Sequence, residues 1–154
     1  MNKFMNLAIA EAEKGLAAGD GGPFGAVIVR AGKILARVHN EVLKNNDPTC
    51  HAEIQAIRAA SKKLKCFDLS DCEIYSNCEP CPMCLAAIYW ARIPKLYFGA
   101  TRADAAKIGF ADKIIYDAIG GKAACERVEK IQVAREKCLQ PFKKWVKMGN
   151  VTQY

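Results

Sequence analysis

The sequence predicts a single α/β domain with three layers, an α/β/α arrangement in which helices cover both faces of a central mixed sheet. Segments whose apolar residues recur at helical spacing alternate along the chain with short apolar segments typical of buried strands. The 154 residues contain no repeat, low-complexity segment or long linker that would divide them. A chain of this length is large enough to bury a hydrophobic core as one domain.

Apolar periodicity and helix-breaking residues locate the individual elements. Helices are expected over residues 2–18, 49–65, 80–92, 103–108 and 141–148. Strands are expected over residues 24–30, 33–38, 72–76, 95–100 and 131–134. Residues 109–130, between the helix expected over 103–108 and the strand expected over 131–134, are the least regular part of the chain.

Turn and cap residues set several of these boundaries. Gly19 ends the first helix, and Ala31-Gly32 joins the first two strands as a hairpin. Asp47 is expected to be the N-cap of the second helix, with Pro48 at its first position. Pro94 prevents the third helix from continuing.

The composition is that of a soluble globular protein, with 51% hydrophobic and 25% charged residues. The first residues become charged too soon to form a secretory signal. The longest uninterrupted apolar stretch, Leu85 to Ala91, is too short to span a bilayer. A cytoplasmic protein with no membrane partner is therefore expected.

The formal net charge of +7 raises the question of a nucleic-acid partner. Basic residues are spread along the chain with acidic residues between them. The two tight groups, Lys62-Lys63-x-Lys65 and Lys143-Lys144-x-x-Lys147, fall in helical patterns. A solvated basic face is favoured over a nucleic-acid footprint, and the charge alone leaves both open.

Eight cysteines are many for a chain of this length, and three of them form the cluster Cys78-x-x-Cys81-x-x-Cys84. In a chain without an export signal, clustered cysteines indicate a metal or redox site more often than a disulfide framework. The other five are expected to behave as small buried hydrophobic residues.

Two fragments at helix starts carry the chemistry, His51-Ala-Glu53 and Pro80-Cys81-Pro-Met-Cys84. Cys81 and Cys84 are three residues apart and share a helical face. With His51 they make three zinc ligands and leave the fourth tetrahedral position for water, which zinc activates as hydroxide near neutral pH. The joint pattern is a documented signature of zinc deaminases, in which the glutamate is the acid/base and not a ligand.

A closed structural site is the alternative from a different class of protein. Cys78 together with His51, Cys81 and Cys84 would fill all four zinc positions and make the chain a structural zinc module. Cys78 precedes the break at Pro80 and need not point with the other two cysteines. His39, the only other histidine, is expected to be a strand-end residue.

The chain resembles the cytidine deaminase-like superfamily and, within it, the small bacterial guanine deaminases. The resemblance covers most of residues 20–116 and extends to the terminal Tyr154. The matching stretches are Gly21–Val29, Asn46–Glu53, Ser76–Cys84, Ala87–Arg92 and Asp104–Asp112.

The resemblance implies a cytidine deaminase-like fold and the hydrolysis of guanine to xanthine and ammonia, with Glu53 as base and then acid. It further implies that Asn40 hydrogen-bonds the ring, that Phe24 and Trp90 wall the pocket, and that Asp112 accepts from ring N–H groups. Core packing remains the other interpretation of the two aromatic residues. Guanine has an N1–H donor that adenine lacks, so a carboxylate facing that edge favours guanine.

Other substrates remain open within the same chemistry. A tRNA adenosine deaminase shares the zinc motifs and would use the basic charge to bind RNA. Against it, three features are similar to guanine deaminases: Ser76-Asn-Cys-Glu before the P-C-x-x-C motif, the Tyr89-Trp90 pair and the segment Gly109-Phe-x-Asp112. A guanosine, cytosine or other nucleobase deaminase is a further alternative.

The resemblance also implies a homodimer whose C-terminal segments, about residues 117–154, are exchanged between subunits. Gly120-Gly121 would be the hinge, and Tyr154 would close the neighbouring active site. The alternative is a disordered tail on a monomer or on a conventionally packed dimer.

Overall fold

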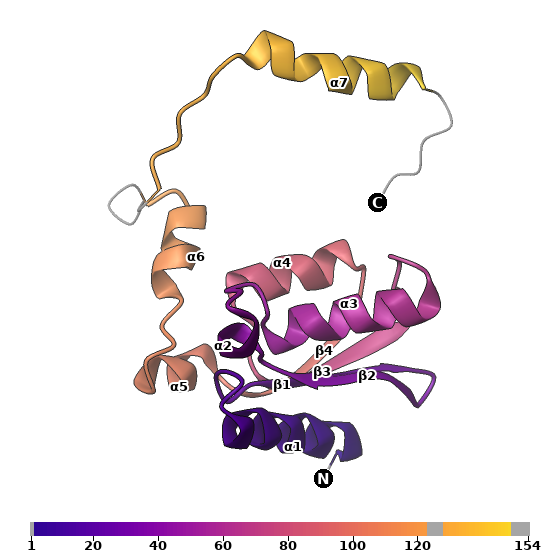
Figure 1. Ribbon diagram of the computed structural model, residues 1–154, viewed down its shortest axis with the longest axis vertical. Helices are drawn as coiled ribbons and strands as arrows, with labels where there is room; N and C mark the ends of the chain where they lie inside the picture. The colour runs from indigo at the N-terminus through magenta and orange to yellow at the C-terminus, as the bar shows by residue number, and fades with distance from the viewer. Residues whose placement is uncertain (1, 123–127, 149–154) are drawn as a thin grey trace.

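The computed structural model describes residues 2–122 and 128–148. Figure 1 shows a central sheet with helix α1 on one face and helices α3 and α4 on the other, which are the three layers expected from the sequence. The strands are β1 (Gly25–Arg30), β2 (Lys33–His39), β3 (Cys72–Cys78) and β4 (Lys95–Ala100). The helices are α1 (Lys3–Ala18), α2 (Val42–Asn45), α3 (Ala52–Leu64), α4 (Pro82–Trp90), α5 (Arg102–Lys107), α6 (Lys113–Ile119) and α7 (Arg135–Lys147).

The sheet is mixed, with strand order β2-β1-β3-β4. β1 pairs antiparallel with β2 and β3, and β3 pairs parallel with β4. Gly25 lies opposite His39 and Cys78 lies opposite Ala100, so the start of β1 and the ends of the other three strands meet at one edge of the sheet. The segments that carry the chemical motifs leave the sheet from this edge.

Strand alternation divides the core into two parts. Ala26 and Ile28 of β1 face the side of α3 and α4, whereas Val27 and Val29 face α1. A row of alanines with no exposed surface lets α3 lie close to the sheet: Ala52, Ala56 and Ala60. Only glycine fits at the start of β1, because a Cβ at position 25 would lie 2.2 Å from the Ala8 carbonyl oxygen of α1.

Two expectations for the helices were wrong. α3 begins after His51, not near residue 49, because the Asp47 side chain closes a turn by accepting from the backbone N–H and hydroxyl of Thr49 at 2.8 and 2.7 Å. α7 begins at Arg135 and runs through Pro141, which costs the helix one internal hydrogen bond but fits its backbone angle.

The expected strand over residues 131–134 is also wrong. The segment is irregular, and Figure 1 shows it as part of the connection that carries α7 away from the sheet, where it has no neighbouring strand to pair with. Two short helices in the described residues, α2 and α6, were not expected. Within the described ranges, no helix combines the length and apolarity that crossing a membrane requires.

Candidate functional site

The first turns of α3 and α4 meet at the sheet edge where β3 ends. His51 is the N-cap of α3, and Cys81 is the N-cap of α4, with Cys84 in the first turn of that helix. The Nδ1 atom of His51 lies 3.5 Å from the Sγ atoms of both Cys81 and Cys84. All three donor atoms lie within 4.8 Å of one another, so the structure brings the three predicted metal ligands together.

This group fits a tetrahedral zinc ion. Zinc binds thiolate sulfur at about 2.3 Å and imidazole nitrogen at about 2.0 Å, which separates a nitrogen from a sulfur ligand by about 3.6 Å in a tetrahedral site. The 3.5 Å separations between His51 and the two cysteines agree with that value. Two sulfurs and one imidazole are also the ligand types that zinc prefers.

Electrostatics at the two cysteines favours a bound cation. The hydrogen bond from the Cys84 thiol lowers the pKa of Cys81 to about 4. The same contact, together with burial, raises the pKa of Cys84. The contact with Cys81 also raises the pKa of His51. Cys81, at the N-terminus of α4, is therefore the thiol that loses its proton more readily, and a divalent cation would displace the proton of Cys84 as well.

Cys78 lies outside the metal-ligand group, although it is close in sequence. It is the buried last residue of β3, and its thiol donates to the carbonyl oxygen of Thr101 at 3.8 Å. Burial raises the pKa of Cys78 to about 11. The structure therefore brings three of the four residues of the alternative closed site together and leaves the fourth apart.

Glu53 lies in the first turn of α3 and is only 5% exposed. The hydroxyl of Ser76 in β3 donates to Glu53 Oε1 at 3.2 Å. Burial is the largest cause of the raised pKa of Glu53, which suits a carboxyl group that must both take and give a proton. Ser76 was not predicted as a site residue; the signal in the sequence is a small polar residue at alternate positions with Cys72 and Ile74, on the same face of the expected strand.

A cleft of about 430 Å³ opens over this group. Phe24 and Phe110 form one wall in an edge-to-face contact with ring centroids 4.9 Å apart. The predicted residues Phe24, His51, Glu53, Cys81 and Asp112 all line the cleft. Lining residues that the sequence did not single out include Glu79, Met83, Arg102, Phe110 and Ile115.

Asp112 lies immediately before α6, on the part of the cleft wall built by α5 and α6. Both of its carboxylate oxygens accept from Nε of Arg102, at 3.0 and 3.1 Å. The structure thus places this carboxylate in the cleft together with a cationic partner.

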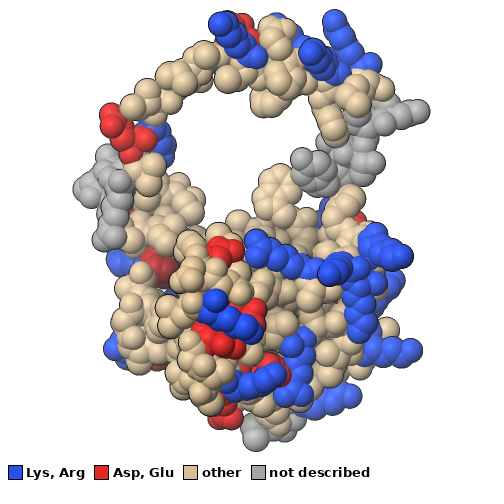
Figure 2. All heavy atoms as spheres, in the orientation of Figure 1, with Lys and Arg blue, Asp and Glu red and all other residues tan. Residues whose placement is uncertain are grey.

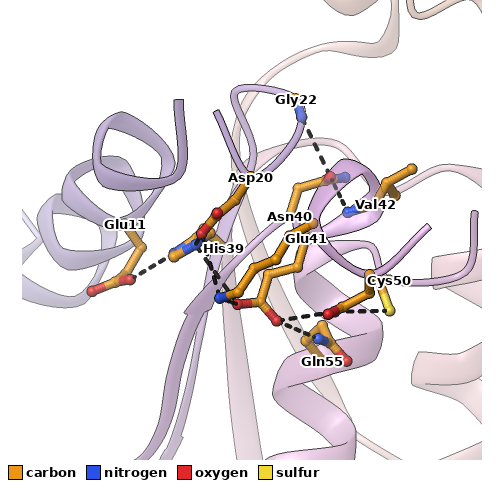
Figure 3. A network of polar contacts seen from close by, with 11 residues as sticks. Glu11, Asp20, Gly22, His39, Asn40, Glu41, Val42, Cys50 and Gln55 are labelled. Atoms are coloured by element: carbon orange, nitrogen blue, oxygen red, sulfur yellow. Dashed lines mark hydrogen bonds and ion pairs between the residues drawn. The ribbon is translucent and has the colours of Figure 1, made fainter. Parts of the chain in front are cut away.

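Asn40 follows β2 in a buried polar network (Figure 3), and its side-chain oxygen accepts from the backbone N–H groups of Gly22 and Val42 at 3.3 and 3.1 Å. It is not among the residues that line the cleft. Its neighbour His39 lies between Glu11, 3.2 Å from Nδ1, and Asp20, 2.8 Å from Nε2, which is the strand-end role expected for it.

The same network contains a second group of potential metal ligands, Asp20, His39 and Glu41. Lys44 already supplies a cation there, since its Nζ lies 2.6 Å from Glu41 and 3.6 Å from Asp20. The described residues therefore present one group with the character of a catalytic metal centre, that of His51.

The structure does not bring Trp90 to the cleft. Trp90 is the last residue of α4, is 68% exposed, and lines a separate surface pocket with Ile57 and Phe67. Tyr154 lies outside the described residues.

Comparisons with known proteins agree with this geometry. The family model for the zinc-binding region of cytidine and deoxycytidylate deaminases matches residues 1–100. The guanine deaminase of Bacillus subtilis is 46% identical over 151 residues, which are 98% of this chain and 97% of that protein. The tRNA-specific adenosine deaminase of Aquifex aeolicus is 41% identical over 97 residues, which are 63% of this chain and 64% of that protein.

The similarity extends to three dimensions. An X-ray structure of guanine deaminase from Bacillus subtilis superposes on this chain with a TM-score of 0.93 at 46% identity, covering 100% of this chain and 99% of that one. This likeness confirms the three-layer fold and the resemblance that the sequence indicated.

Proposed function

Because the chain belongs to the cytidine and deoxycytidylate deaminase family, we propose that it hydrolyses guanine to xanthine and ammonia. The observation that carries the proposal is one cleft in which a buried carboxyl group, Glu53, lies beside the three potential ligands His51, Cys81 and Cys84. The nearly full-length similarity to the Bacillus subtilis guanine deaminase supports guanine as the substrate.

We propose zinc as the metal, held by His51, Cys81 and Cys84. Zinc, when bound, lowers the pKa of a water molecule to near neutrality and so supplies the nucleophile. The start of α4 supports the ligand role of the two cysteines, because a helix N-terminus favours the thiolate form. Cys78 takes no part in metal binding and packs at the end of β3.

Glu53 moves the protons of the reaction. It accepts a proton from the attacking water and delivers it to a ring nitrogen as the oxygen adds to C2 of guanine. It then takes the proton of the hydroxyl group now on C2 and passes it to the amino group, which leaves as ammonia as its bond to C2 breaks and the C2 carbonyl of xanthine forms. Ser76 holds the carboxyl group in place through its hydroxyl hydrogen bond. The apolar surroundings that raise the pKa of Glu53 make the protonated form accessible.

The cleft walls select the base. Phe24 and Phe110 offer flat apolar surfaces for a purine ring, and Asp112 accepts from the N1–H edge that distinguishes guanine from adenine. Asn40 and Tyr154 remain proposed substrate contacts, whereas Trp90 lines a separate surface pocket and is not proposed as one. The bonds that Asn40 makes to two backbone N–H groups give it a role in shaping the loop behind the cleft.

The rival proposal is deamination of adenosine in tRNA, favoured by the partial similarity to the tRNA-specific enzymes. The basic residues give it little support. On the face shown in Figure 2, Lys and Arg lie on α7 and on the body, mostly toward its right, and acidic side chains lie next to several of them at the centre of the body. Several are paired with acidic groups, such as Arg30 with Asp71 and Arg92 with Asp68, both at 2.6 Å.

A substrate panel tests the proposed function. Ammonia release is measured with guanine, guanosine, cytosine, adenine and an adenosine-containing RNA hairpin at low and high salt. We expect guanine to be the best substrate with weak salt dependence, because a neutral base releases no phosphate counterions. Faster turnover of the RNA, with a steep salt dependence, would replace this proposal with the tRNA function.

We also propose that the chain is a homodimer that exchanges its C-terminal segment. α7 stands apart from the body of the molecule in Figures 1 and 2, and a free helix with this much apolar surface is unfavourable in water. Its exposed apolar side chains are Phe142, Trp145 and Val146. A second subunit that receives this segment would bury them.

Deletion of residues 152–154 tests the role of the tail in this proposal. We expect guanine turnover to fall sharply while zinc content and the thermal midpoint stay near those of the intact protein, because a lid that excludes water strengthens the interactions with developing charge. Sedimentation should show a dimer in both proteins. Wild-type turnover by the truncated chain would show that the tail does not close the site.

A further inference from the structure

We propose that Arg102 is a positioning residue that fixes the Asp112 carboxylate for the substrate base, an inference that rests on the proposed function. Arg102 is the first residue of α5, and it lines the same cleft as Asp112. Its Nε donates to both carboxylate oxygens, at 3.0 and 3.1 Å. A carboxylate has about four lone-pair directions, so this contact leaves acceptor capacity on each oxygen for a ring N–H group.

Arg102 is itself held on two further sides. Its guanidinium carbon lies 3.6 Å from the ring centroid of Tyr116 in α6, a close cation–π contact. Its backbone N–H donates to Oε2 of Glu79 at 3.0 Å. Contacts with Tyr116 and Glu79 thus restrain the arginine independently of Asp112, so the carboxylate has a partner that is itself held in place.

The same contacts connect the specificity wall to the metal centre. The Tyr116 hydroxyl donates to the carbonyl oxygen of Pro80 at 3.4 Å, and Pro80 directly precedes the ligand Cys81. Asp112, Arg102, Tyr116 and Pro80 therefore form a continuous path from the carboxylate to the start of α4. Such a path fixes the distance between the group that would recognise the base and the group that would act on it.

The positive charge of Arg102 also stabilises the negatively charged Asp112 side chain in the cleft. The Asp112 side chain is 16% exposed and the Arg102 side chain 30%, so both are partly withdrawn from water. A carboxylate in such a position is stabilised by a guanidinium that remains charged at every relevant pH. The planar guanidinium of Arg102 stacks on Tyr116 and at the same time donates from Nε to Asp112. A lysine at this position would keep the positive charge but could not make both contacts.

A double-mutant cycle tests this inference with four proteins: wild type, Arg102→Met, Asp112→Asn and the double variant. Arg102→Met should raise KM for guanine about tenfold or more and change kcat much less, because Glu53 and the metal ligands are untouched. In the Asp112→Asn background the same change should alter KM by less than about twofold, since the group that Arg102 positions is already altered. Arg102→Lys should recover part of the loss.

Arg92 provides the matched control. It also forms an ion pair, with Asp68 at 2.6 Å, and lies 5.6 Å from the ring centroid of Phe67, but it is not among the residues that line the cleft. Arg92→Met should leave KM unchanged whatever it does to the thermal midpoint, and zinc content is measured for every variant.

Three results would overturn the inference. They are an unchanged KM in Arg102→Met, an equal KM increase in both backgrounds, and an increase of the same size in Arg92→Met. Absence of guanine turnover by the wild type would overturn the proposed function and this inference together, whereas the other results would overturn the inference alone.

Discussion

Glu53→Gln should lower guanine turnover by about two orders of magnitude or more while the protein keeps its zinc, the usual scale for the loss of a general acid/base group. Glutamine keeps the size of the side chain and can still accept from the Ser76 hydroxyl, which donates to Oε1 at 3.2 Å. It cannot accept the proton of the attacking water. Steady-state kinetics and elemental analysis on the same preparation measure the two quantities.

Glu11→Gln is the control for loss of a buried carboxyl group. Glu11 is also 5% exposed, but it pairs with Arg37 at 2.7 Å and with His39 at 3.2 Å, away from the cleft. This change should lower the thermal midpoint and leave kcat close to that of the wild type. Near-normal turnover by Glu53→Gln would remove the assigned acid/base role.

Cys81→Ser should lose both the metal and the activity. Removal of one of three ligands leaves His51 and Cys84, and a serine hydroxyl is a poor ligand for zinc. We expect zinc content well below one per chain and turnover close to the uncatalysed rate. Elemental analysis and ammonia release are the measurements.

Cys78→Ser separates the open site from the closed one. Cys78 is buried at the end of β3 and donates to the carbonyl oxygen of Thr101 at 3.8 Å, and a serine hydroxyl can make the same hydrogen bond. This variant should keep most of its zinc. Loss of the metal from Cys78→Ser would favour the four-ligand structural site.

Much of the fold could be predicted because local patterns and tertiary packing agree in the first hundred residues. Successive apolar side chains of β1 point alternately into the two core clusters, on opposite faces of the sheet. The helical periodicity of α1 and α3 gives each helix an apolar face that packs on the sheet. The segment over residues 131–134 is equally apolar but forms no strand, because a strand also needs a neighbour, and sequence periodicity does not supply one.

The group of three potential metal ligands was predictable from the same kind of local signal. His51 and Cys81 each cap a helix, and both helices start at the sheet edge where β3 ends, so two short motifs suffice to bring the ligands together. Trp90 lies at the other end of α4 from Cys81, about 13.5 Å away along the helix axis at 1.5 Å per residue. Although Trp90 is close in sequence to the potential ligands Cys81 and Cys84, the length of the helix separates it from the cleft.

Residues that hold a site residue in place, without contacting the substrate themselves, could hardly be recognised from the sequence. Arg102 resembles any other basic residue on an exposed helix until the structure shows its contacts with Asp112 and Tyr116. Ser76 is detectable only as a polar residue in a buried strand, and its partner Glu53 lies 23 positions away. Such pairs depend on the packing of α3 against β3, which is a tertiary property.

The measurement that tests the central claim most directly is a zinc titration of metal-depleted protein, followed by the conversion of guanine to xanthine. The proposed chemistry predicts little turnover at the start, a rise in proportion to added zinc, and a plateau at about one zinc per chain. Full conversion of guanine by protein that elemental analysis shows to be free of metal would contradict it.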